Sequence, residues 1–243
     1  SNGATLRCLD GDRPDFRQRR RVAYEVTSQD RQWKRRYTMS FVPAADFPEF
    51  FGFEEHALNS PDPHYFTWFE KNADGTTRNF WASGNPGFLL SRYDAKPDEY
   101  PTSVEAKGRT GTALRLVTQS TGDLGAAFGK PIAAGNLFVG TFDLASALFN
   151  PLAATRFGVP VNRIPTRFEG YYKWQPGEAF TNAERKAVQG PAADGKDAPR
   201  IYAVVYRNAD AEGKAVTLDG SNILSSPLVV AVAVLDDFTV TGV

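Results

Sequence analysis

Short apolar runs of strand length, separated by glycine, proline and polar turns, constrain the fold of this chain most. Between residues 133 and 174 they are AAGNLFVGTF and RFGVPVNRIPTRFEGYYKW. Runs of this length that end at turn-forming residues are typical of β-strands. We predict strands at 112–119, 134–142, 167–174, 200–207, 214–219, 227–235 and 236–242. Helical patterns are confined to 144–149 and 181–186, so the chain is predicted to be all-β.

The first 46 residues form a separate pattern. Val22, Tyr24 and Val26 alternate with polar neighbours, and the alternation resumes after a polar turn at 28–31. This period of two predicts an antiparallel hairpin with one buried face. A hairpin alone is marginally stable in water, and residues 4–19 offer one more strand. Two prolines between 42 and 48 predict a linker, so we divide the chain into domains at 1–46 and 47–243.

Charge and composition exclude several classes of protein. Lysine and arginine total 28, as do aspartate and glutamate, so the net charge gives no reason to expect a nucleic-acid partner. A single cysteine, Cys8, cannot form an intrachain disulfide or a cysteine metal site. No apolar run approaches the roughly 20 residues of a transmembrane helix. Nucleophile and dinucleotide motifs are absent as well, so no motif indicates an enzyme.

Aromatic residues are abundant, at 13% of the chain, and those grouped in segments 65–88 and 171–174 point to sugar binding. An aromatic ring can lie under the apolar C–H face of a sugar while planar polar side chains reach its hydroxyl groups. The loop-rich segment 65–88 offers such types in Trp81, Asn85 and Arg78. Tryptophan is also a common core residue, and we expect Trp68 to be buried. For Trp81 the core and the ligand-binding interpretations both stay open.

A second aromatic group lies at 171–174. Strand alternation puts Tyr172 and Trp174 on one face, with Tyr171 and Lys173 on the other. Only one of these pairs can meet a ligand while the other packs in the core. Sequence alone does not choose between them, and we select Tyr172 and Trp174 as candidate sugar contacts.

Two other classes of function remain open. A glycoside hydrolase needs a pair of carboxylates, for which Glu169 and Glu178 are candidates, although neither lies in a specific motif. His56 and His64 fit no zinc-ligand spacing. A structural adhesin or scaffold module without a small ligand is the third interpretation, because a fold does not determine a function.

Several phrases, taken in order, carry a family resemblance. The opening Gly52-Phe53-Glu54 is followed by WASGNPGF, LRLVTQST, AAGNLFVGTF, RFGVPVNRIPTRFEGYYKW and IYAVVYRN. Over about residues 50–235 the chain resembles the family called the "putative carbohydrate metabolism domain". The resemblance implies a partial immunoglobulin-like β-sandwich module, of which VTSQDRQWKRRYTMSF is similar to the closing hairpin. A larger jelly-roll β-sandwich resembling carbohydrate-binding modules would follow it.

The same resemblance carries further expectations. It implies an exported surface lipoprotein, in the outer membrane or periplasm, of a Bacteroidetes carbohydrate-utilisation system. The phrase LDDFTV resembles the closing strand of carbohydrate-binding jelly rolls, where early and late acidic residues share a structural calcium ion. Here the ligands would be Glu54 with Asp236 or Asp237, oxygen donors that suit a hard cation. We therefore expect a non-catalytic glycan-binding protein, with an oligosaccharide as its partner.

Overall fold

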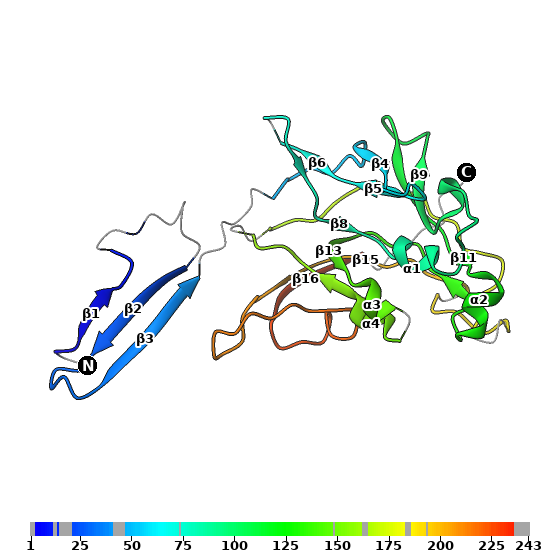
Figure 1. Ribbon diagram of the computed structural model, residues 1–243. Coiled ribbons are helices and arrows are strands. Elements are labelled where there is room, and N and C mark those ends of the chain that lie inside the picture. Colours follow the sequence, from blue (N-terminus) through cyan, green and yellow to red (C-terminus); the bar gives the residue numbers. More distant parts are fainter. Residues whose placement is uncertain are drawn as a thin grey trace. The chain divides into compact units, whose positions relative to one another are not determined.

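In the computed structural model the chain divides into two compact units (Figure 1). One comprises residues 1–47 and 160–162, and the other comprises 48–159 and 163–243. The structure describes residues 3–11, 14, 21–40, 47–72, 74–147, 149–161, 165–182, 186–192 and 194–235.

The first unit is a three-stranded antiparallel sheet in the order β1-β2-β3. Its strands are β1 (Thr5–Cys8), β2 (Arg21–Thr27) and β3 (Lys34–Ser40). The amide of Ser28 donates to the carbonyl of Trp33 and the amide of Gln32 to the Asp30 carboxylate, so polar residues close the turn between β2 and β3. The predicted hairpin and the added strand are confirmed, but the buried face predicted for the hairpin is not. Only Val22 is buried on β2, and Tyr37 and Met39 on β3 are exposed.

The second unit is built from small antiparallel sheets. One has three strands in the order β14 (Thr155–Phe157), β13 (Phe138–Phe142) and β8 (Trp81–Ala82). Two-stranded pairs are β4 (His56–Leu58) with β5 (Phe66–Trp68), β6 (Glu70–Lys71) with β7 (Thr77–Arg78), β9 (Thr102–Glu105) with β10 (Ala113–Leu116), β11 (Gln119–Ser120) with β12 (Ile132–Ala133), and β15 (Ile201–Tyr206) with β16 (Val229–Leu235). The predicted all-β class is confirmed.

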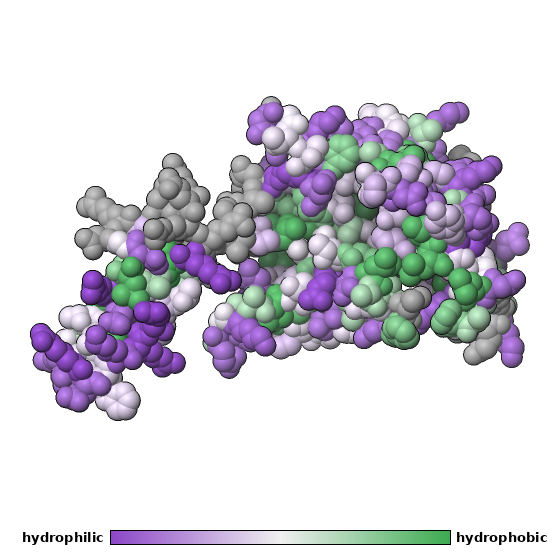
Figure 2. Space-filling view, viewed as in Figure 1, coloured by the Kyte–Doolittle hydropathy of each residue, from purple (hydrophilic) through white to green (hydrophobic). Residues whose placement is uncertain are grey.

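Short helices connect these strands. They are α1 (Asn85–Leu89), a 3-10 helix at Pro97–Glu99, α2 (Gly122–Ala127), α3 (Leu144–Ala147) and α4 (Pro151–Ala154). Apolar side chains remain exposed on and beside them, among them Leu124, Phe128, Leu144, Phe149 and Leu152. Figure 2 shows green side chains gathered over this region. These helices therefore lie on the surface of the unit.

The predicted strands at 200–207 and 227–235 are confirmed. The strand predicted at 134–142 forms only over 138–142, and that predicted at 112–119 forms mainly in its centre, at 113–116. The strands predicted at 167–174 and 214–219 are wrong. Residues 167–174 belong to no ladder among the described residues, and 214–219 form only isolated bridges. A strand needs a neighbouring edge as well as an alternating pattern, and no described strand forms a continuous ladder with either segment. The strand predicted at 236–242 lies outside the described residues.

The core of the second unit sits under α1. Phe88 and Tyr100 pack edge to face, with ring centroids 5.2 Å apart, and Ala95 completes the buried group. Tyr65 packs against the same Tyr100 ring. Trp68 is also buried, with 3% of its surface exposed, which confirms its predicted place in the core.

Close backbone contacts explain the glycines of the phrase AAGNLFVGTF. A Cβ on Gly135 would lie 2.3 Å from the carbonyl oxygen of Pro101. Gly140 has a φ of +145°, and a Cβ there would lie 1.9 Å from the carbonyl oxygen of Arg156 on β14. Only glycine, which has no Cβ, tolerates both close approaches. The packing around β13 therefore requires the two glycines of this phrase.

Candidate functional site

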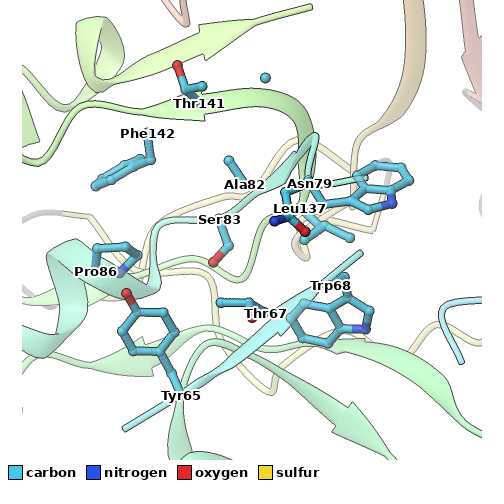
Figure 3. Close-up of a pocket in the computed structure, with 12 residues that line it drawn as sticks. Tyr65, Thr67, Trp68, Asn79, Ala82, Ser83, Pro86, Leu137, Thr141 and Phe142 are labelled. Carbon is cyan, nitrogen blue, oxygen red and sulfur yellow. The ribbon is translucent and has the colours of Figure 1, made fainter. Parts of the chain in front are cut away.

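The second unit contains a pocket of about 300 Å³ between β5, β8, β13 and the start of α1. Figure 3 shows side chains from β5 on one side, side chains from β13 on the other, and Ala82 and Ser83 between them. Its twelve described lining residues are Tyr65, Thr67, Trp68, Asn79, Trp81, Ala82, Ser83, Pro86, Leu137, Gly140, Thr141 and Phe142. Apolar walls with a few polar groups are the usual composition of a small-ligand site.

Strand pairing places the walls of the pocket. On β8, Trp81 lies opposite Val139 and Ala82 opposite Phe138 of β13. These two paired antiparallel strands both contribute residues to the lining of the pocket. The turn that follows β8 is held by Asn136, whose side-chain oxygen accepts a 2.8 Å hydrogen bond from the amide of Gly84. Residues far apart in the sequence thus form one rigid wall.

Trp81 is half-buried and is held from several sides. Its indole Nε1 donates a 3.0 Å hydrogen bond to the carboxylate of Glu70 on β6. The rings of Phe51 and Phe53 lie 5.2 and 5.4 Å from it, measured between centroids. These contacts fix the indole before a ligand arrives, which lowers the entropic cost of binding.

Polar groups at the pocket remain available for a ligand. Asn79 and Thr141 are exposed, and no described residue hydrogen-bonds to their side chains. The hydroxyl of Ser83 accepts a 3.3 Å hydrogen bond from the amide of Asn85 and keeps its own proton to donate. A tyrosine hydroxyl is protonated at neutral pH, and burial raises the pKa of Tyr65 further. Such neutral donors and acceptors suit the hydroxyl groups of a sugar.

None of the twelve described lining residues is an aspartate or a glutamate. The two candidate catalytic carboxylates lie elsewhere. Glu169 is exposed and forms an ion pair with Arg167, and Glu178 is also exposed. The structure therefore does not bring Glu169 and Glu178 into this pocket.

Of the sugar contacts predicted from sequence, only Trp81 lines the pocket. Asn85 is fully buried, and its side chain is hydrogen-bonded to the backbone of Thr102. A ligand cannot touch it in this structure, so we leave Asn85 out of the site. Arg78 lies on β7 with its guanidinium 6.0 Å from the centre of the Phe80 ring and does not line the pocket.

Tyr172 and Trp174 do not line the pocket either. They are half-buried, while Tyr171 and Lys173 are exposed, so the predicted alternation is present although the segment is not in a sheet. The exposed pair is therefore the one that was not selected from sequence. Which pair packs inward depends on contacts with the rest of the unit rather than on the local pattern.

The candidate calcium ligands cannot be placed together. Glu54 accepts hydrogen bonds from the amide and the hydroxyl of Thr112, at 2.8 and 2.9 Å, and the amide bond is the main reason that its pKa is lowered. Asp236 and Asp237 lie outside the described residues. Within the described part of the chain no group of three or more histidine, cysteine or acidic side chains could hold a metal. Calcium binding through Glu54 stays a prediction.

Several lining residues were not predicted as site residues. Tyr65 and Asn79 lie in the loop-rich segment 65–88, where their polar types were a usable signal. Thr141 and Phe142 lie on β13, and nothing in the local sequence relates them to residues 65–83. They reach the pocket only because β13 pairs with β8.

Among the solved structures that resemble this chain are two from Bacteroides species. A "putative glycoside hydrolase" from Bacteroides thetaiotaomicron is 37% identical, with a TM-score of 0.70 over 99% of this chain and 66% of the other. A "putative glycoside hydrolase" from Bacteroides vulgatus is 34% identical, with a TM-score of 0.61 over 77% of this chain and 71% of the other. The chain thus spans just under two thirds of the first protein. Both similarities are consistent with a β-sandwich.

No curated protein matches the sequence. Among the described residues, no helix has the length and apolar character needed to cross a membrane. The family described as "putative carbohydrate metabolism domain" matches residues 52–241, which include every residue that lines the pocket. This match covers most of the chain and confirms the resemblance noted in the sequence. The chain belongs to the putative carbohydrate metabolism domain family.

Proposed function

We propose that this protein binds a glycan without cleaving it, through the pocket between β5, β8 and β13. The observation that carries the proposal is the lining itself. The Trp81 indole, held by its hydrogen bond to Glu70, lines the same pocket as the unpaired polar side chains of Asn79 and Thr141. None of the described lining residues is acidic. The indole would stack on the C–H face of a sugar while the amide and hydroxyl groups bind its hydroxyls.

The family and the Bacteroides relatives support a carbohydrate as the ligand class. By the same resemblance we propose that the protein is exported and acts at the outer membrane or in the periplasm, as a surface lipoprotein of a glycan-utilisation system.

Glycoside hydrolysis is the second candidate function, because each of the two solved relatives is called a "putative glycoside hydrolase". Hydrolysis requires two carboxyl groups about 5 to 9.5 Å apart across the scissile bond. The described lining residues include no carboxylate, which favours binding over that chemistry at this pocket.

A glycan array followed by isothermal titration calorimetry tests the proposal. Trp81→Ala and Asn79→Ala should each weaken binding of the selected glycan by at least about fivefold, because each removes a ligand contact. Trp33→Ala is the matched control, since this tryptophan is 78% exposed in the first unit. Unchanged binding in both pocket variants would contradict the pocket assignment.

The hydrolase alternative is tested on the same glycan. Wild-type protein is incubated with it, and new reducing ends are measured. Sugar release that is lost in Glu169→Gln or Glu178→Gln would favour hydrolysis. Binding without release supports a non-catalytic protein.

A further inference from the structure

Tyr171 and Arg109 form a stacked pair on the surface of the second unit. The Tyr171 side chain is 80% exposed, which is unusual for a large aromatic ring. The guanidinium carbon of Arg109 lies 3.5 Å from the ring centroid, directly over one face. A cation at this distance is attracted to the ring and restricts its movement. The opposite face of the ring is left for another molecule.

Arg109 projects from a well-held hairpin tip between β9 and β10. The amide of Gly108 donates a 2.8 Å hydrogen bond to the carbonyl of Gly111, which closes the tip. Gly111 has a φ of +59°, a conformation that favours glycine. Next to it, Thr112 is fixed by its two hydrogen bonds to Glu54. The stack with Tyr171 is therefore supported from the arginine side by backbone structure.

Arg109 and Lys173 supply positive charge at the ring. Lys173 shares the exposed side of the extended segment with Tyr171. Among the described residues no carboxylate forms an ion pair with Arg109 or Lys173, whereas Arg167 and Glu169 are paired with each other. A guanidinium that stacks on a ring by its flat face keeps its N–H donors in its own plane, pointing outward. Two of these donors match the spacing of two oxygens of an anionic group.

We propose that Tyr171 and Arg109 form a second saccharide subsite, separate from the pocket, that selects an anionic sugar unit. The C–H face of the sugar stacks on the open face of Tyr171. The carboxylate or sulfate of the neighbouring unit of the oligosaccharide extends past the edge of the ring and accepts hydrogen bonds from Arg109, and Lys173 adds positive charge. This inference goes beyond the proposed function, because it concerns a different surface and does not require a ligand in the pocket.

Calorimetry with three oligosaccharides of equal length tests the proposal: a galacturonan, a sulfated galactan and a neutral galactan. We expect one or both anionic probes to bind about two- to fivefold more tightly than the neutral one, the range of an exposed charged contact. The uronate and sulfate arms show which anion is preferred. Tyr171→Ala and Arg109→Gln should remove this preference, and neither should lower the melting temperature because both side chains are exposed.

Tyr93→Ala and Arg207→Gln are matched controls, since they change an exposed tyrosine and an exposed arginine elsewhere in the unit. Both should keep the preference for the anionic probes. Equal affinity of wild-type protein for all three probes, or no binding of either anionic probe, overturns the proposal. Loss of neutral-glycan binding in Trp81→Ala concerns only the pocket, so failure at one surface is distinguishable from failure at the other.

Discussion

Asn85 offers the sharpest distinction between a structural and a ligand-binding role. Its side-chain amide donates a 2.8 Å hydrogen bond to the carbonyl of Thr102, and its side-chain oxygen accepts a 3.2 Å bond from the amide of the same residue. Both groups of Thr102 are buried. Asn85→Ala would leave them without a partner, at a cost of about 1–3 kcal/mol for each. We expect the free energy of unfolding to fall by about 3 kcal/mol.

Urea denaturation followed by tryptophan fluorescence measures this loss, and thermal unfolding should show a decrease of about 6–12 °C in melting temperature for a unit of this size. Asn79→Ala is the matched control, because it removes the same amide from an exposed position at the pocket. That variant should unfold within about 0.5 kcal/mol of wild type and lose glycan affinity. An Asn85→Ala protein within about 1 kcal/mol of wild-type stability but defective in binding would refute the structural role.

Two further predictions concern pH and metal. Burial raises the pKa of Tyr100 to about 12, from about 10 in the unfolded chain. The neutral Tyr100 hydroxyl therefore contributes fully to the stability of the folded protein below pH 10, and this contribution is lost as the pH rises toward 12. Tyr100→Phe should flatten this alkaline decline in unfolding experiments; an identical decline would assign it to other groups. If Glu54 binds calcium with Asp236 or Asp237, EDTA should lower the melting temperature of wild type and not of Glu54→Gln. An equal response of both proteins would contradict this ligand set.

The local pattern of the sequence was sufficient for the all-β class and for the first unit. Alternation at 21–27 and 34–40 corresponds to β2 and β3, because the side chains of a strand point to opposite faces in turn. Alternating burial at 171–174 was also predictable for the same reason. The strands expected at 167–174 and 214–219 were not formed, because an alternating pattern does not supply a hydrogen-bonding neighbour.

Tertiary structure alone decided the sites. Asn85 has the residue type of a sugar contact, but the chain folds so that Thr102 takes its amide. The pocket combines Tyr65, Trp81 and Thr141 because β13 pairs with β8, a contact between segments more than fifty residues apart. Arg109 and Tyr171 are also far apart in the sequence, and they meet through the packing of the unit rather than through strand pairing. A period of two in the sequence determines which side chains share a face, whereas long-range packing determines which face is covered and what lies opposite it.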